Sequence, residues 1–220
     1  GKRDAAAAQY SRVAQCYAGR GEAPKALIRL AGLEADEGKY DASIKTYTSI
    51  LDTFKQVDIR MDALIGRGKA QYRMYKFDAA MQDFATVAET DPKRRDEARF
   101  MLALCLYSVG RDKEARVAGT AFLTDFPESL RVPDMTLWLA KFDFNHGDYA
   151  MARKGFLDYV SRWPEARWAD AAQLWAARAA FFQNDFTGCV EEVSKLTRKT
   201  PESPRMPEAL SLQADALIEL

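Results

Sequence analysis

Residues 147–164 read GDYAMARKGFLDYVSRWP, and this stretch contains the pattern that decides the fold. It runs from a glycine turn through an aromatic residue, Tyr149, and a small residue, Ala152, to Pro164. Gly147 suits the left-handed backbone that closes a helix, and proline ends a helix because it has no N–H to donate. Apolar residues recur at helical spacing between the two. The stretch therefore predicts a helix bounded by a turn and a proline.

The same pattern recurs along the whole chain. Prolines follow one another at intervals of 35, 37 and 37 residues, at Pro92, Pro127, Pro164 and Pro201. About halfway between them lies a turn with an aromatic and then a small residue; the copies are Gly38-Lys39-Tyr40 with Ser43, Lys76-Phe77 with Ala80, Gly147-Asp148-Tyr149 with Ala152, Asn184-Asp185-Phe186 with Cys189, and, more weakly, Gly110 with Ala115. Small residues let packed helices approach to about 8–10 Å. The recurrence predicts an all-α stack of helix pairs.

This pattern resembles the tetratricopeptide repeat, whose antiparallel helix pairs of about 34 residues stack into a solenoid. The resemblance implies a single right-handed α-solenoid of about twelve helices. Full repeats are expected at 24–57, 61–94, 96–129, 133–166 and 170–203, with half repeats at 1–20 (a helix over about 3–18) and 207–220. Neither end reads as a polar cap, so we expect a piece of a longer array that could self-associate through its terminal repeats.

Composition and charge exclude several classes of partner. The 220 residues contain 32 Lys and Arg against 32 Asp and Glu, so the net charge favours neither nucleic acid nor an anionic membrane. No apolar run reaches the roughly 18 residues of a membrane span, so this segment is not expected to insert into a membrane. Cys16, Cys105 and Cys189 lie far apart without metal-ligand spacing. We expect free thiols, no metal and no cofactor.

His146 is the only histidine and therefore the first candidate for acid–base chemistry. A general base needs a nucleophile or an orienting carboxylate, and Asp148 could serve as the latter. The same residues, however, are typical of a turn that ends a helix. A stand-alone hydrolase would need a nucleophile–base pair, which the sequence does not offer, so no catalytic residue is predicted.

Two other polar segments also favour a structural interpretation. Gly66-Arg67-Gly68-Lys69 lacks the spacing of a phosphate-binding loop and falls inside a predicted first helix, with Gly68 at the small position. The acidic segments Glu34–Glu37 and Glu191–Glu192 are expected to lie on solvated helix faces.

The resemblance also implies a partner-binding surface, because in this family the first helix of each repeat lines the concave side. The positions that face the groove hold Lys69, Tyr72, Arg73, Phe100, Tyr107, Trp138, Lys141, Phe144, Trp175, Arg178 and Phe181. Ile65, Leu104, Leu137, Leu174 and Phe182 share these faces, and packing in the core is the alternative for any single aromatic. Aromatic residues with Lys and Arg are the composition of interface hot spots, although Asp62, Glu97 and Asp134 make the charge uneven.

The function expected from this surface is that of a non-enzymatic adaptor that holds a segment of a partner protein. The alternative is a regulatory or oligomerisation module of a larger enzyme or signalling protein. The linkers at 126–133 and 201–209 look like those of bacterial cell-envelope repeat proteins, such as outer-membrane assembly lipoproteins and the Tol–Pal accessory protein. That likeness implies the periplasm, with the cytoplasm as the alternative.

Overall fold

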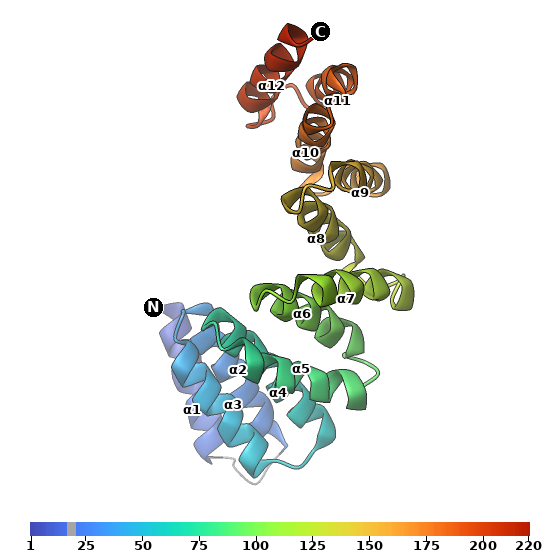
Figure 1. Ribbon diagram of the computed structural model, residues 1–220. Coiled ribbons are helices and arrows are strands. Elements are labelled where there is room, and N and C mark those ends of the chain that lie inside the picture. The colour runs from blue at the N-terminus through green and yellow to red at the C-terminus, as the bar shows by residue number, and fades with distance from the viewer. Residues whose placement is uncertain (17–20) are drawn as a thin grey trace. The chain divides into compact units, whose positions relative to one another are not determined.

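The computed structural model describes residues 1–16 and 21–220 of the chain. Within these residues it contains twelve helices and no strand, which confirms the predicted fold class (Figure 1). The helices are α1 (Lys2–Cys16), α2 (Glu22–Asp36), α3 (Tyr40–Thr53), α4 (Val57–Arg73), α5 (Phe77–Thr90), α6 (Arg95–Ser108), α7 (Asp112–Asp125), α8 (Val132–Asn145), α9 (Tyr149–Arg162), α10 (Ala169–Phe182), α11 (Phe186–Lys199) and α12 (Met206–Ile218). Residues 17–20 of the predicted first half repeat, and with them the end of the helix expected over 3–18, lie outside the described residues.

The aromatic and proline markers bound the second helix of each pair as predicted. Four second helices, α3, α5, α9 and α11, begin at the aromatic residue of the turn. The helices that precede the four repeat prolines, α5, α7, α9 and α11, each end two residues before the proline. Proline offers no N–H to the preceding turn and biases the residue before it toward extended backbone, so the helix stops there.

The turn that closes each first helix has a left-handed residue in every repeat. Gly38, Gly110 and Gly147 have φ angles of 75°, 75° and 79°, as predicted from their type. At the equivalent places in the other two repeats Tyr75 and Asn184 both have φ of 60°. Asparagine tolerates this conformation, whereas a tyrosine there carries a steric cost. Tyr75 is nevertheless 81% exposed, so its side chain does not compensate that cost by burial.

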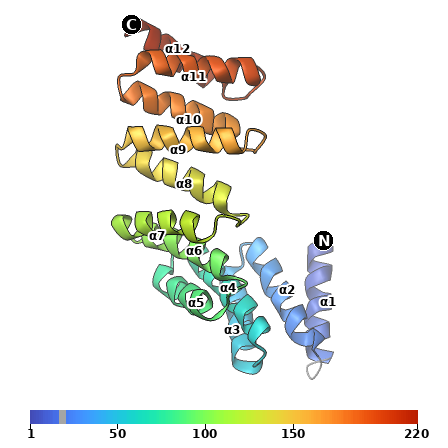
Figure 2. The ribbon, with the colours of Figure 1, turned by 90° about the vertical axis from the view of Figure 1, so that its right-hand side faces the viewer.

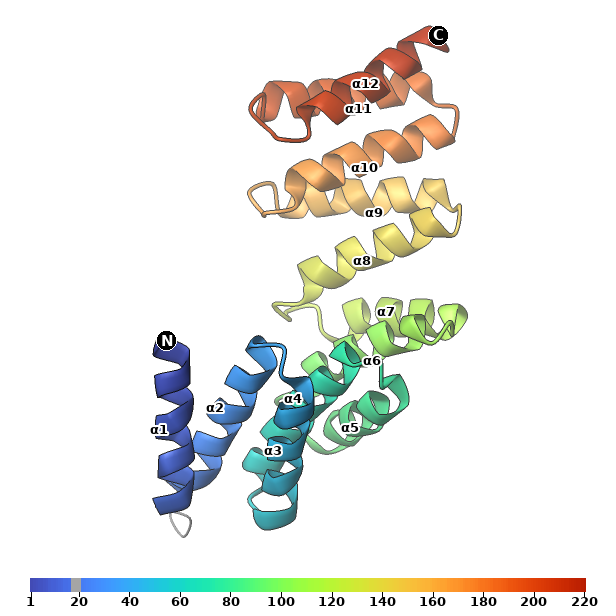
Figure 3. The same cartoon turned by 90° about the vertical axis from the view of Figure 1, so that its left-hand side faces the viewer.

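The helices form two compact units, an N-terminal unit of residues 1–118 and a C-terminal unit of residues 119–220. In the N-terminal unit each helix from α1 to α6 packs against the next, and the first helices α2 and α4 also touch (Figure 3). In the C-terminal unit α8 to α12 form successive layers (Figure 2). The assignment of the whole chain to one solenoid stays a prediction.

The small positions of the repeat lie in the packed interior. Ser43, Ala80, Ala115, Ala152 and Cys189 are all fully buried, as their spacing predicted. The buried hydroxyl of Ser43 is tolerated because it donates a hydrogen bond of 2.8 Å to the carbonyl oxygen of Ala31 on the neighbouring helix. A larger side chain at these positions would have to displace its neighbours.

The three cysteines are free thiols, as predicted. Cys105 and Cys189 are buried, and burial raises their thiol pKa values to about 12 and about 11. Both are therefore protonated at neutral pH and behave as small apolar residues. Cys16 is exposed on α1.

Candidate partner-binding site

A hollow on the first helices of the N-terminal unit brings predicted groove residues together. It has a volume of about 630 Å³, and we call it the Arg73 hollow. Its lining includes Asp36 of α2, Tyr40 of α3, Lys69, Tyr72 and Arg73 of α4, and Leu104 of α6. Neighbouring first helices therefore contribute to one surface, as the repeat register predicts.

The polar groups of the Arg73 hollow differ in whether they have partners. Lys69 forms an ion pair with Glu97, and the Tyr72 hydroxyl lies 3.2 Å from the hydroxyl of Ser108. The exposed Arg73 has no ion pair among the residues that the structure describes. Arg73 is therefore the cation of this hollow that is open to an outside carboxylate.

A second hollow adjoins the first on the same unit. It has a volume of about 820 Å³, lies between α1, α2 and α4, and is called here the Tyr47 hollow. Asp36 lines both hollows. The expectation of a solvated acidic face fits the exposure of Asp36 but misses its place in the two hollows. The register could have found it, since Asp36 precedes Arg73 by 37 residues, one repeat step.

The other predicted residues of the N-terminal unit lie outside the two hollows. Phe100 and Tyr107 are half-buried on α6 and line neither. Ile65 is buried in the core of the unit. Packing inside the unit therefore explains, at least in part, why these three positions hold aromatic and aliphatic residues.

The aromatic groove residues of the C-terminal unit form a half-buried network. The Phe144 and Trp175 rings meet edge to face, with centroids 4.8 Å apart. Phe181 packs against Phe186 at 5.3 Å, and Trp138 against Phe142 at 5.5 Å. Leu137 and Leu174, on the same helix faces, are buried. These rings contribute to packing and keep part of their surface accessible.

The two cations of this unit that were predicted to face the groove are placed differently. Arg178 contacts Glu208 of α12, and its guanidinium carbon lies 4.8 Å from the Trp175 ring centroid. Lys141 is exposed, and its ammonium nitrogen lies 6.0 Å from the ring of Trp168. Trp168 is 40% exposed, and the guanidinium carbon of Arg167 lies 4.8 Å from its ring centroid. The sequence interpretation missed Trp168 because it lies in the residues inserted after Pro164, outside the repeat register.

The segment Gly66–Lys69 has a packing role rather than a phosphate-binding role. A Cβ at Gly66 would lie 2.2 Å from the ring of Tyr47, and one at Gly68 would lie 2.8 Å from the ring of Phe84. Between them, Arg67 donates two hydrogen bonds to the buried carboxylate of Asp83. The two glycines thus let aromatic rings of the second helices lie against α4.

Replacing Gly66 by alanine should lower the stability of the protein by about 1–3 kcal/mol, because the Tyr47 ring must move to admit the new methyl group. Gly32→Ala is a matched control, since Gly32 also lies inside a helix and its Cβ would be 3.9 Å from the Tyr47 hydroxyl. There alanine should raise stability by about 0.5–1 kcal/mol through its helix propensity. Urea unfolding followed by circular dichroism measures both, and equal shifts would contradict the close contact at Gly66.

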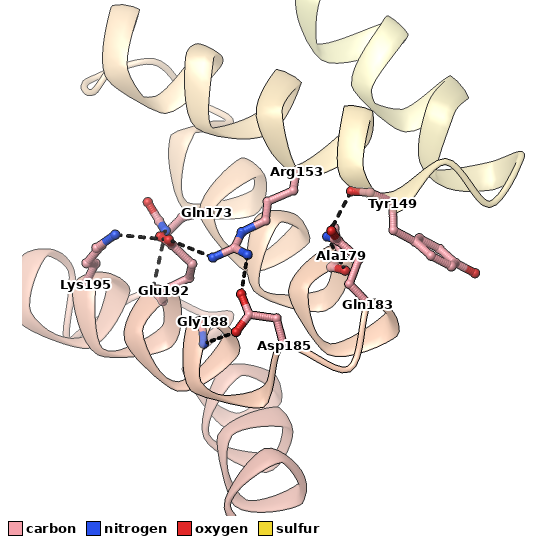
Figure 4. Close-up of polar contacts among 9 residues, drawn as sticks. All are labelled: Tyr149, Arg153, Gln173, Ala179, Gln183, Asp185, Gly188, Glu192 and Lys195. Carbon is pink, nitrogen blue, oxygen red and sulfur yellow. Dashed lines mark hydrogen bonds and ion pairs between the residues drawn. The ribbon is translucent and has the colours of Figure 1, made fainter. Parts of the chain in front are cut away.

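A buried polar network joins three helices of the C-terminal unit (Figure 4). Glu192 is only 3% exposed, so the prediction that it lies on a solvated face is wrong. Its carboxylate accepts a 2.7 Å hydrogen bond from Gln173 and pairs with Lys195 at 3.0 Å and Arg153 at 3.7 Å. Arg153 also binds Asp185 at 2.5 Å. The charge of Glu192 is buried because partners from α9, α10 and α11 surround it.

The candidates for chemistry have structural roles. His146 caps the end of α8, its ring stacks on Phe142 at 4.0 Å, and its Nδ1 lies 2.7 Å from the Phe142 carbonyl oxygen. The Asp148 carboxylate accepts a hydrogen bond from the Met151 amide at the start of α9. In the described part of the chain, no cluster of three metal-ligating side chains occurs. None of the described helices combines the length and apolarity needed to cross a membrane.

Comparison with known proteins supports the repeat interpretation. The family model of the tetratricopeptide repeat matches residues 65–129. The C-terminal part of a TPR repeat-containing protein from Cytophaga hutchinsonii has a TM-score of 0.75 and 16% identity, over 95% of this chain and 79% of that one. BtubC from P. vanneervenii has a TM-score of 0.72 and 15% identity, over 90% and 87%.

A third solved structure is described as YrrB, a TPR protein with an unusual peptide-binding site. It has a TM-score of 0.60 and 14% identity, over 84% of this chain and 91% of that one. At such identities the likeness shows the fold alone. No curated protein sequence matches the chain.

Proposed function

We propose that this chain, which carries the tetratricopeptide repeat over residues 65–129, is a non-catalytic adaptor that holds an extended segment of a partner protein against its first helices. The observation that carries the proposal is the Arg73 hollow, where neighbouring first helices place apolar side chains beside an unpaired cation. The structural likeness to YrrB, described as having a peptide-binding site, gives further support.

The chemistry of the predicted groove residues suits such a role. Aromatic side chains gain about 25 cal/mol for each Å² of apolar surface that a partner covers, before the costs of ordering are subtracted. Arg73 and Lys141 add charge that can attract and orient a partner. Lys69 and Arg178 already have acidic partners, so they contribute less free charge than the composition of the surface indicates.

The test begins with capture of the partner by cross-linking in cells that make the protein, followed by affinity measurement with the purified partner. Trp138→Ala should weaken binding about thirtyfold, the effect of losing a 2 kcal/mol anchor. Lys141→Glu should act mainly on the association rate and its salt dependence. Circular dichroism must first show that each variant is folded.

The control for these variants is Lys154→Glu, which changes an exposed residue of the second helix α9. The neighbouring Arg153 is unsuitable because it holds the buried Glu192. Unchanged binding by Trp138→Ala, Lys141→Glu and Arg73→Glu, together with loss of binding by Lys154→Glu, would move the site to the second helices and remove this proposal.

The cellular setting that we propose is the bacterial envelope, on the likeness of the linker sequences at 126–133 and 201–209 to those of bacterial cell-envelope repeat proteins. Ser129 and Ser203 occupy equivalent places, and each hydroxyl accepts a hydrogen bond from the backbone amide two residues later. Each linker leads into a helix with proline in its first turn. Fractionation of the cells that make the protein tests the setting, and recovery with the cytoplasmic enzymes would contradict it.

A further inference from the structure

The Tyr47 and Arg73 hollows of the N-terminal unit carry unpaired groups of opposite charge. We propose that they select a partner segment by charge order, with a lysine or arginine side chain in the Tyr47 hollow and a glutamate or aspartate against Arg73. This inference rests on the proposed function and specifies the chemistry of the partner.

The first observation is a hydroxyl without a partner at the Tyr47 hollow. Tyr47 is 6% exposed, and its hydroxyl makes no hydrogen bond to any described residue. Burial, with further contributions from Asp36, Asp62 and Glu34, raises its pKa to about 12, so the group keeps its proton. The hydroxyl lies at the hollow, where a lysine or arginine side chain can donate a hydrogen bond to its oxygen.

The second observation is the charge around that hydroxyl. Asp36 is exposed, lines the Tyr47 hollow and has no ion pair among residues 1–16 and 21–220. It is the last residue of α2, where the free carbonyl groups of a helix add negative potential. The cations that line this hollow, Lys25 and Arg29, precede Asp36 on α2 by eleven and seven residues. Asp62 also lines the hollow, but its carboxylate is already paired with Arg94. The Asp36 end therefore favours a cation.

The Arg73 hollow offers the complementary charge. Arg73 ends α4, and its guanidinium can hold a carboxylate through two parallel hydrogen bonds. Tyr40, Tyr72 and Leu104 provide apolar surface beside it. A segment with an apolar residue next to its acidic residue would use both features.

The spacing of the two charges follows from the packing of the helices. Asp36 and Arg73 are the last residues of the neighbouring first helices α2 and α4, so they are displaced by about one helix spacing, which is roughly 10 Å. An extended chain advances about 3.3 Å per residue. The basic and acidic side chains of the partner should therefore lie about three residues apart.

The probes for this inference are capped synthetic peptides of nine residues. One has a lysine followed three residues later by a glutamate with leucine between them, a second has the reverse order, and a third has norleucine and glutamine in place of the two charges. Fluorescence anisotropy with the full chain at low salt should show one charged order binding about tenfold more tightly than the neutral peptide.

Variants assign each charge to its hollow. Asp36→Asn and Tyr47→Phe should each weaken binding of the preferred peptide severalfold and leave the neutral peptide unchanged. Tyr47→Phe removes only an oxygen without a partner, so a purely structural role would leave affinity unaltered. Arg73→Glu should abolish the preference for the peptide that carries glutamate. The same variant should bind a peptide in which lysine replaces that glutamate, which the parent protein binds weakly. Asp52→Asn on the second helix α3 is the matched control and should have no effect.

Equal binding of the charged and neutral peptides would overturn the charge order. So would the absence of saturable binding to any peptide up to about 1 mM. The proposed function has its own test in capture of the native partner. If that partner depends on Trp138 while the peptides show no charge preference, the inference falls and the adaptor function stands.

Discussion

Arg67→Met is expected to lower the free energy of unfolding by about 3–5 kcal/mol, since it leaves a buried carboxylate without its counter-ion. The two oxygens of Asp83 accept hydrogen bonds of 2.8 and 2.7 Å from Nε and Nη2 of Arg67. Asp83 is buried, and Arg67 is its one ion-pair partner in the described part of the chain. Methionine keeps the aliphatic part of the arginine side chain, so the loss reports the charge pair rather than a cavity.

The matched control is the double variant Arg67→Met with Asp83→Leu. It removes both charges, and replacement of a buried ion pair by apolar residues is often neutral or stabilising. Chemical unfolding of the two variants and the parent protein gives the comparison. A double variant as unstable as Arg67→Met alone would show that packing around Arg67, and not its charge, is what the fold requires.

Leucine at the small positions Ala80 and Ala152 should cost about 1–3 kcal/mol each, the second large effect expected from the structure. Both residues are fully buried, so the larger side chain must displace its neighbours or adopt a strained rotamer. Thermal and urea unfolding measure the loss, one variant in each unit.

Lys113→Leu provides the reference, because Lys113 is exposed on α7 and the change there should be nearly neutral. The order of the unfolding midpoints is the informative result. If Ala80→Leu and Ala152→Leu unfold at the same urea concentration as Lys113→Leu, the small positions of the register are assigned to the wrong face.

Backbone features were predictable from the sequence because single residue types determine them. Pro92, Pro127, Pro164 and Pro201 lack an N–H, and each lies two residues beyond the end of a helix. The glycine turns were found for a similar reason. The turn at Tyr75 shows the limit, because Tyr75 has a left-handed conformation that its residue type does not predict.

Side-chain partnerships were predictable only in part, since they depend on which helices face one another. The register places Lys69, Tyr72 and Arg73 together, and the structure has all three in one hollow. The acidic character of Glu192 favoured solvent, and only the arrangement of Arg153 and its neighbours explains its burial. Trp168 lies in an insertion, where a repeat pattern gives no information.

The packing of each helix against its neighbours in sequence has a consequence for how the chain folds. Within each unit the principal contacts join successive helices, so few residues far apart in sequence must meet before stable structure forms. Chains with such local contacts pay little loop-closure entropy and fold in microseconds to milliseconds. Within a unit, folding can start at any helix pair and spread to the adjacent pair, so that each unit behaves as a one-dimensional cooperative array. In such an array a local defect lowers the stability of its neighbours most and fades with distance along the chain.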